Sequence, residues 1–187
     1  NLRCAFGDRY DDAGRRRIAK GSYQTFARTF LDLFWSSKLT KDTWQPFFDI
    51  HIPQPHIEER VRQTGGVWVT PHFGNFALIS MVWGYRGFPF TVLAQDFKNE
   101  ALTMLFRRLR EGSGHTIIPQ ENAMLKLIKT LKRQGHAGLL TDLNIEPGKA
   151  AAAIQCFGLW TCVPTLHVEL AKRLGLSIIT GVCRSLP

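Results

Sequence analysis

The sequence lacks long apolar runs, has few cysteines, and carries fewer acidic than basic residues. No stretch reaches the roughly 18 consecutive apolar residues of a membrane-spanning helix, and no charged-then-apolar leader precedes a small-residue cleavage site. The four cysteines form no C-x-x-C pair and have no zinc-site spacing, so we predict neither a disulfide framework nor a metal site. We therefore expect a chain with no bilayer-spanning segment, in a reducing compartment.

The charge balance is strongly basic, with 24 Lys and Arg against 15 Asp and Glu, which gives a net charge of +9. Such a surface suits an anionic partner: nucleic acid, an acidic membrane surface, or a phosphorylated or acidic carrier substrate. No nucleic-acid motif or aromatic-basic signature accompanies the charge, so we expect no nucleic-acid partner.

The apolar pattern alternates between short runs and helical stretches. It predicts strands at 67–70, 90–94, 116–118, 137–142 and 177–182, with helices between them at about 75–86, 98–111, 121–134 and 164–174. This alternation predicts an α/β fold with a largely parallel central sheet flanked by helices. Before it, residues 12–35 predict a basic amphipathic helix that either packs on the core or lies on a membrane surface, and a polar helix follows near 56–64.

One histidine stands out, in the segment Thr70-Pro71-His72-Phe73-Gly74-Asn75-Phe76. It lies where the first predicted strand of the sheet ends and a helix begins, the usual position of a working site in an open α/β sheet. An imidazole there can take a proton from a hydroxyl, and Gly74 would let backbone approach a substrate closely. A structural, hydrogen-bonding histidine is the alternative for the same pattern.

The wider motif resembles that of the bacterial lipid A biosynthesis (lauroyl/myristoyl) acyltransferases, which carry H-F-G-N-W-E where this chain reads His72-Phe73-Gly74-Asn75-Phe76-Ala77. Leu139-Leu140-Thr141-Asp142-Leu143-Asn144 is similar to the family's A-D-Q-N stretch. Further matches follow in the same order along the chain: Asn1-Leu2, Ala5-Phe6, Lys98-Asn99, Arg107-Arg108-Leu109-Arg110, Gly114, Phe157-Gly158, Pro164-Thr165, Leu170-Ala171 and Arg184.

The resemblance implies a fold like that of glycerol-3-phosphate acyltransferase and no cofactor. An acyl carrier protein or acyl-CoA thioester would donate a fatty acyl group to a lipid acceptor, a hydroxyl of a lipid A precursor or a related glycolipid or phospholipid. His72 would act as general base, without a Ser or Cys nucleophile, and Gly74 and Asn75 would bind substrate. The reaction would take place at an anionic membrane surface, the cytoplasmic face of the inner membrane.

The resemblance also bears on domain organisation. We expect residues 1–187 to form a single acyltransferase domain, with a helical lead-in at 1–64 and an α/β catalytic core at 65–187. Members of the family usually carry an N-terminal membrane helix and extend further at the C-terminus. The chain opens at Asn1 without an initiator Met, and it stops just after an apolar run. We therefore expect a fragment that lacks both parts.

Ala77 departs from the family pattern, because it stands where the motif has its acid. A carboxylate there could fix the imidazole tautomer and stabilise an imidazolium, and Ala can do neither. Three explanations remain open: another acid substitutes, activity has been lost, or the alanine replaces a native acid. Ala150 to Ala153, poor strand formers, raise the same question of replacement. If another acid substitutes, Asp142 is the first candidate and Glu146 the second, although Asp142 could equally be a turn or capping residue.

The remaining candidates are basic. Arg107, Arg108 and Arg110 lie on the predicted helix at 98–111, and arginine forks suit phosphate groups. The resemblance implies that at least one of them contacts substrate phosphate or the carrier, with Lys98 and Asn99 nearby; a solvated basic face is the alternative. The competing function is a catalytically weakened lipid- or acyl-carrier-binding homologue that kept the fold after losing the acid.

Overall fold

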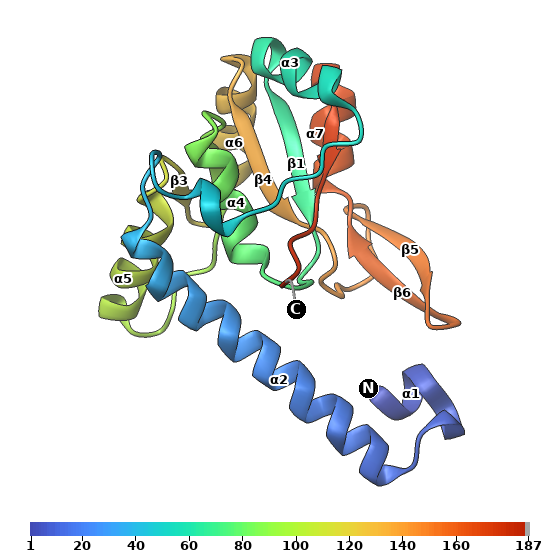
Figure 1. Ribbon diagram of the computed structural model, residues 1–187. Coiled ribbons are helices and arrows are strands. Elements are labelled where there is room, and N and C mark those ends of the chain that lie inside the picture. The colour runs from blue at the N-terminus through green and yellow to red at the C-terminus, as the bar shows by residue number, and fades with distance from the viewer. Residues whose placement is uncertain (186–187) are drawn as a thin grey trace.

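The computed structural model describes residues 1–185, and a five-stranded parallel sheet forms its centre (Figure 1). The strands are β1 (Gly66–Thr70), β2 (Phe90–Leu93), β3 (Thr116–Ile118), β4 (His136–Leu140) and β7 (Ile178–Thr180). Their order across the sheet is β3-β2-β4-β1-β7, and every neighbouring pair is parallel. The predicted α/β fold with a largely parallel, helix-flanked sheet is confirmed.

Helices cover both faces of this sheet, because successive strand side chains point to opposite sides. On one face, α6 (Ala123–Lys132) and α7 (Leu166–Leu174) pack on aliphatic strand residues such as Val67 and Leu139. On the other, α3 (Pro55–Thr64) and α4 (Phe76–Tyr85) cover a cluster that includes Trp68 and Phe90. The helix α5 (Glu100–Glu111) connects β2 to β3.

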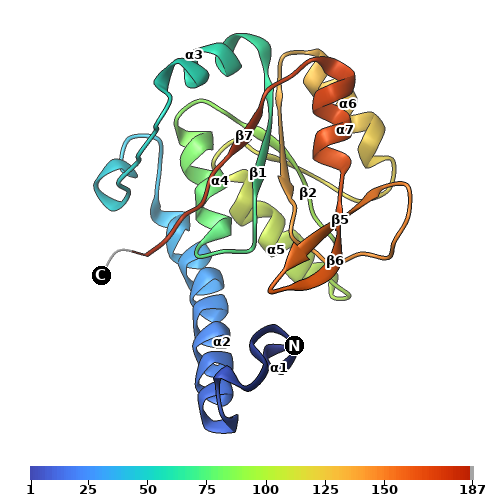
Figure 2. The ribbon, with the colours of Figure 1, turned by 90° about the vertical axis from the view of Figure 1, so that its right-hand side faces the viewer.

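The N-terminal part is helical and forms an arm. A short helix α1 (Leu2–Phe6) precedes α2 (Asp12–Trp35), whose start is capped by the Asp11 carboxylate accepting from the Gly14 N–H at 2.7 Å. The C-terminal half of α2 packs on α4 through Leu33, whereas its N-terminal half projects away from the sheet (Figure 2). The arm therefore reaches beyond the carboxyl ends of β1 and β4.

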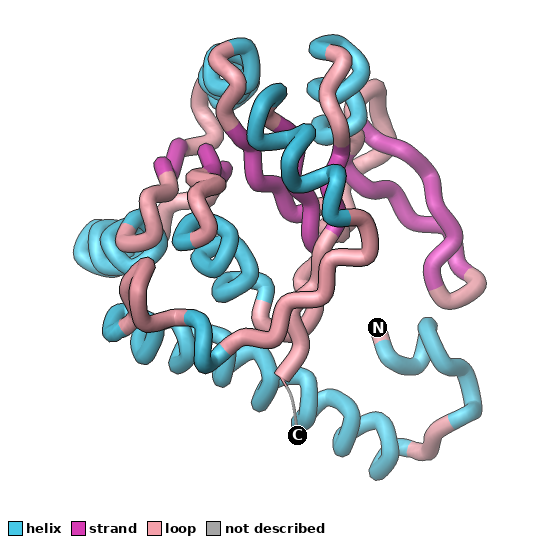
Figure 3. Tube along the Cα trace, turned by 45° about the horizontal axis from the view of Figure 1, so that its top comes forward, coloured by secondary structure: helices cyan, strands magenta, loops and turns pink. Residues whose placement is uncertain are grey.

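A separate antiparallel hairpin was absent from the sequence prediction. It consists of β5 (Ala151–Cys156) and β6 (Leu159–Pro164), and Figure 3 shows it standing apart from the central sheet. Alanines are poor strand formers, which is why residues 150–153 gave no strand signal. Full pairing with β6, from Ala151 opposite Pro164 to Cys156 opposite Leu159, overrides that weak propensity.

The other predicted elements occur with boundaries that differ by at most two residues, as helix and strand ends commonly do. The strand predicted at 137–142 spans His136–Leu140, and the helix predicted at 121–134 spans Ala123–Lys132. Within residues 1–185, no helix combines the length and the apolar character that crossing a bilayer requires. The division into a lead-in and a core stays a prediction.

Candidate active site

Strand register brings two predicted site residues together. β1 ends at Thr70 and β4 at Leu140, and these two residues are direct neighbours in the parallel pairing. His72 lies two residues beyond the first strand end and Asp142 two residues beyond the second. Because the carboxyl ends of parallel strands lie at the same edge of the sheet, His72 and Asp142 lie next to each other just beyond that edge.

His72 and Asp142 share two hydrogen bonds. The ring Nδ1 of His72 lies 2.8 Å from Oδ1 of Asp142, and the backbone N–H of His72 donates to Oδ2 at 2.8 Å. An ionised carboxylate only accepts, so the proton of the neutral imidazole lies on Nδ1 and the lone pair on Nε2. The side chains are 29% and 39% exposed, which leaves the pair within reach of a substrate.

Position 77, where the family motif has its acid, is occupied by an alanine in apolar surroundings. Ala77 packs against the buried side chains of Leu33, Met81 and Phe106. Asp142 is the acid that contacts His72, although it comes from a different strand end. Glu146, the second candidate, is exposed, and residues 1–185 offer it no hydrogen bond or ion pair.

Gly74 and Asn75 hold the motif loop to two other segments. Gly74 has a φ of +57°, and a Cβ there would lie 1.9 Å from the carbonyl oxygen of Cys183. The Asn75 side chain caps α4 by accepting from the Leu78 N–H at 3.1 Å, and it donates to Asp32 at 2.7 Å. The close approach expected at Gly74 is therefore made by the chain itself. A substrate-binding role for either residue stays a prediction.

Asp32 is a residue that the sequence analysis did not single out. Its carboxylate on α2 holds Asn75 at the start of α4, and so ties the N-terminal arm to the histidine loop. Thr29, one turn earlier, donates to the Gly74 carbonyl at 3.2 Å. A polar residue inside an amphipathic helix carries no distinctive spacing, so the sequence offered no signal for this contact.

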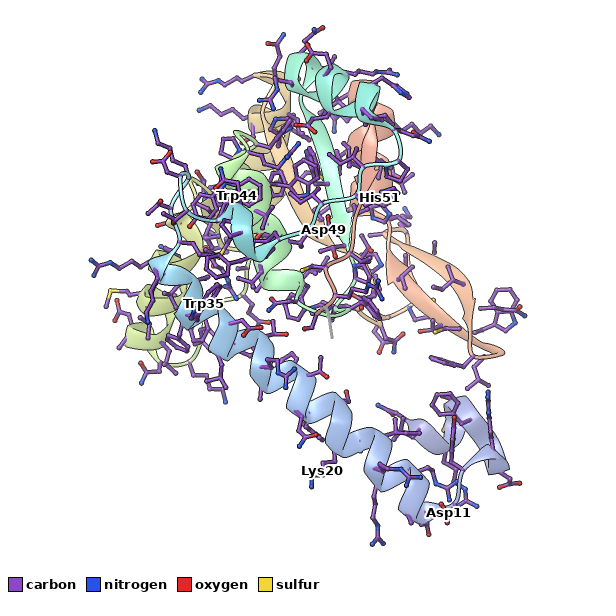
Figure 4. The ribbon with its side chains drawn as sticks, viewed as in Figure 1. Asp11, Lys20, Trp35, Trp44, Asp49 and His51 are labelled. Carbon is purple, nitrogen blue, oxygen red and sulfur yellow. The ribbon has the colours of Figure 1, made fainter. Side chains whose placement is uncertain are left out.

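An open cleft of about 1380 Å³ is lined by His72 together with residues of α4 and of the central strands. Its walls are mostly apolar or aromatic, with Phe76, Ile79 and Val92 among them. The extended segment 48–54 forms part of the rim, and Figure 4 marks Asp49 and His51 on it as it crosses in front of β1. The Phe76 and His72 rings pack edge to face, with 4.8 Å between their centroids.

The three arginines of α5 have different surroundings. Arg107 pairs with Asp96 at 3.5 Å, and Arg108 is exposed. Arg110 lines the cleft, and burial lowers the pKa of its guanidinium. Arg110 is therefore the arginine of the three that lines the cleft, and a phosphate-binding role for any of them stays a prediction.

The two residues predicted near the start of α5 also differ. Asn99 caps that helix by accepting from the Leu102 N–H at 3.1 Å, which gives it a structural contact. Lys98 is exposed at the end of the preceding loop. Their substrate-binding roles stay predictions.

Two buried histidines, His115 at the wall of the cleft and His136 in the aromatic layer, are held neutral. His115 Nδ1 accepts from the Phe90 N–H at 2.8 Å, so Nε2 donates to the Ser80 carbonyl at 2.7 Å. Burial lowers its pKa to about 4. His136 accepts from the Trp68 indole at 3.2 Å, and burial, followed by the charge of Arg62, lowers its pKa to about 4. Both serve as hydrogen-bonding parts of the aromatic layer.

The sequence profile of one protein family matches nearly the whole chain: the bacterial lipid A biosynthesis acyltransferases, over residues 1–185. The chain belongs to this family. A search of curated proteins finds no match. The reaction to be considered for the His72–Asp142 pair and the adjoining apolar cleft is therefore acyl transfer. Among the described residues, no group of three His, Cys, Asp or Glu is placed to hold a metal ion.

Proposed function

We propose that this acyltransferase moves a fatty acyl group from an acyl carrier protein or CoA thioester to a hydroxyl of a lipid A precursor or a related glycolipid or phospholipid. The observation that supports this most directly is the His72–Asp142 pair at the mouth of an apolar cleft. A base with a free Nε2 lone pair beside apolar walls suits a reaction between a hydroxyl and a long-chain acyl thioester.

The proton transfer follows from the tautomer. Asp142 holds the proton on Nδ1, and Nε2 takes the proton of the acceptor hydroxyl as its oxygen attacks the thioester carbonyl carbon. The tetrahedral intermediate then collapses, the carbon–sulfur bond breaks, and the imidazolium returns the proton to the leaving thiolate. Asp142 stabilises the imidazolium between these steps, by the same logic as the buried aspartate of a serine-protease triad.

Two further features would favour the reaction. The N-terminus of α4 begins four residues after His72, and a helix N-terminus favours negative charge such as that developing on the carbonyl oxygen. Arg110, at the wall of the cleft, would bind a phosphate of the acceptor or of the carrier arm. Because the acceptor is a lipid, the reaction belongs at a membrane surface, and we assign it to the cytoplasmic face of the inner membrane.

The second candidate function is lipid or acyl-carrier binding without efficient turnover. One observation favours it: Ala77 stands in apolar contacts where the family motif has an acid. Under this alternative, Asp142 would only fix the loop through the His72 backbone N–H. The two candidates differ in one measurable quantity, turnover of a bound thioester.

The test is acyl transfer from a labelled acyl carrier protein thioester to a lipid extract, with wild type, His72→Ala and Ala77→Glu compared. The proposal predicts transfer by wild type and a loss of about 10²–10⁴-fold in His72→Ala, the usual contribution of a general base. Wild type that binds the thioester without transferring it, while Ala77→Glu transfers it, would show that Asp142 does not replace the motif acid. Binding without turnover in every variant would favour the second candidate.

A further inference from the structure

The hairpin of β5 and β6 ends in an exposed apolar tip. The segment from Ala150 to Pro164 contains no Asp, Glu, Lys or Arg. At the tip, Phe157 is 63% exposed and Trp160 72% exposed, and Leu159 and Ile154 are exposed beside them. This tip, residues 154–160, stands away from the central sheet and from its hydrophobic clusters (Figure 1).

The tip exposes apolar groups on both of its faces. Residues directly opposite each other in an antiparallel pair share a face. Cys156 pairs with Leu159, and Gln155 pairs with Trp160, so Leu159 and Trp160 point to opposite sides. A protein surface docked on the hairpin would cover one side and leave the other in water. An apolar medium that surrounds the tip would cover both.

The turn keeps a phenylalanine where its backbone conformation is unfavourable. Phe157 and Gly158 form a two-residue loop in which both φ angles are positive, at 53° and 75°. Asn, Asp and Gly suit such turns, and a bulky residue with positive φ is rare. The ring meets the Phe6 ring of the N-terminal arm, with 5.3 Å between the two centroids, and the side chain is 63% exposed. Phe157 therefore adds little to the stability of the turn, and its large apolar side chain is better explained by contact with an external apolar surface.

The adjoining arm is basic. Arg16, Arg17, Lys20 and Arg28 are exposed along α2, and Figure 4 shows Lys20 pointing away from the α/β core. Aromatic side chains with a polar atom, above all Trp, favour the boundary between lipid and water, and basic residues are attracted to anionic headgroups. Arm and tip lie on the same side of the molecule, beyond the carboxyl ends of the strands (Figures 1 and 2).

The middle of the hairpin, next to the tip, is joined to the loop that follows Asp142. The Thr161 hydroxyl donates to the Asn144 side chain at 2.7 Å, and the Ile145 N–H donates to the Cys162 carbonyl at 3.0 Å. Anything that the tip binds to therefore also sets the distance between its own surface and the Asp142 loop.

From these observations we infer that the hairpin tip, residues 154–160, inserts into the headgroup region of an anionic lipid bilayer while the basic face of α2 lies on it. Insertion is shallow, because the edges of a two-stranded hairpin carry unpaired backbone groups that the hydrocarbon core would leave unsatisfied. The inference deepens the proposed function, since it assigns the membrane contact of the same site. It is tested without any acyl transfer.

The experiment measures binding of the 187-residue chain to vesicles made of equal parts phosphatidylethanolamine and phosphatidylglycerol. The double variant Phe157→Asn, Trp160→Ser removes the two exposed aromatic side chains of the tip. Because Asn-Gly suits the turn better than Phe-Gly, we expect the hairpin to fold as in wild type. We expect its partition to fall by about tenfold or more, since two large apolar side chains lose their burial. Circular dichroism and thermal unfolding check the fold.

Leu125→Ser is the matched control. Leu125 is 68% exposed on α6, which covers the sheet away from the hairpin, and its replacement should leave vesicle binding unchanged. Binding should also weaken with added salt and on neutral phosphatidylcholine vesicles, because the arm contributes through charge. Equal partition of wild type and the double variant would overturn the inference, as would a lipid-free dimer that only wild type forms.

The outcome is separable from that of the proposed function. Transfer to a detergent-dispersed acceptor is measured in parallel for both proteins. A double variant that keeps this transfer and loses vesicle binding supports the inference. Vesicle binding by wild type without any transfer would count against the proposed function and leave the membrane contact standing.

Discussion

The two faces of the central sheet are built from different side chains. Under α6 and α7 the layer is aliphatic, with Val67, Leu127 and Leu139 buried in one cluster. Under α3 and α4 it is aromatic, with Trp68 and Phe90 beside the neutral histidines 115 and 136, and Trp68, Phe90 and Val92 of this face line the cleft. The face under α6 and α7 is packed with aliphatic side chains. The face under α3 and α4 is made of aromatic rings and hydrogen-bonded imidazoles, several of which line the cleft.

This difference indicates a division of roles. Close-packed aliphatic contacts give stability that any void reduces. Atoms that face an open cleft already lack partners on one side, so losing some of them costs less stability. We therefore expect substitutions on the α6–α7 face to act on folding, and substitutions on the cleft face to act on substrate handling.

The largest effect on stability should come from Leu127→Ala. Leu127 is fully buried in the aliphatic layer, and its truncation should lower the free energy of unfolding by about 2–5 kcal/mol. Leu125→Ala on the same helix is the exposed control and should change it by less than about 0.5 kcal/mol. Urea titration measures both. Equal losses for the two variants would remove the distinction on which the comparison rests.

The aromatic face should make stability depend on pH. The pKa of His115 is about 4 in the folded protein against 6.5 for an ordinary histidine, so the unfolded chain binds more protons between these values. Its contribution to stability is present in full above pH 6.5 and is lost as the pH falls towards 4, by an amount of about 3 kcal/mol.

Urea midpoints at pH 7 and pH 4.5 check this expectation. His115→Phe should reduce the difference between the two midpoints, because it removes one of the two buried histidines whose pKa is lowered to about 4. His51→Gln is the control at an exposed histidine and should leave the difference unchanged. An unaltered pH dependence in His115→Phe would show that another group sets it.

A smaller effect is expected from a matched pair of valines. Val67→Ala on the closed face should cost about 2 kcal/mol of unfolding free energy, from lost burial and the void left behind. Val92→Ala on the cleft wall should cost about half as much and should raise the KM for the acyl thioester. If Val92→Ala destabilises as much as Val67→Ala without altering KM, the cleft face is packed like the other.

The sequence predicted the sheet and its helices because their apolar runs have clear periods and boundaries. It missed the hairpin, since strand pairing from Ala151 to Pro164 depends on a partner segment and not on local propensity. His72 could be found from its motif. The contact of its ring with Asp142 depends on the register of β1 against β4, which local sequence does not encode, so Asp142 was one of two candidates.

Polar contacts across the arm were harder still. The ties from Asp32 to Asn75 and from Thr29 to Gly74 join residues 43 and 45 positions apart. Such side chains look like ordinary polar positions of an amphipathic helix until the helix is docked. Gly74 was predicted to let backbone approach a substrate; the group that lies against it is the Cys183 carbonyl, and substrate contact stays a prediction.

The most direct test of the central claim, that Asp142 fixes His72 as the base, is the acyl-transfer rate of Asp142→Asn across pH, with Glu146→Gln as control. We expect kcat to fall by about 10²–10⁴-fold in Asp142→Asn. The free energy of unfolding should change by less than about 1 kcal/mol, because the pair is partly exposed, and Glu146→Gln should keep wild-type rates. Full activity in Asp142→Asn, or a fall in Glu146→Gln alone, would rule out this role of Asp142.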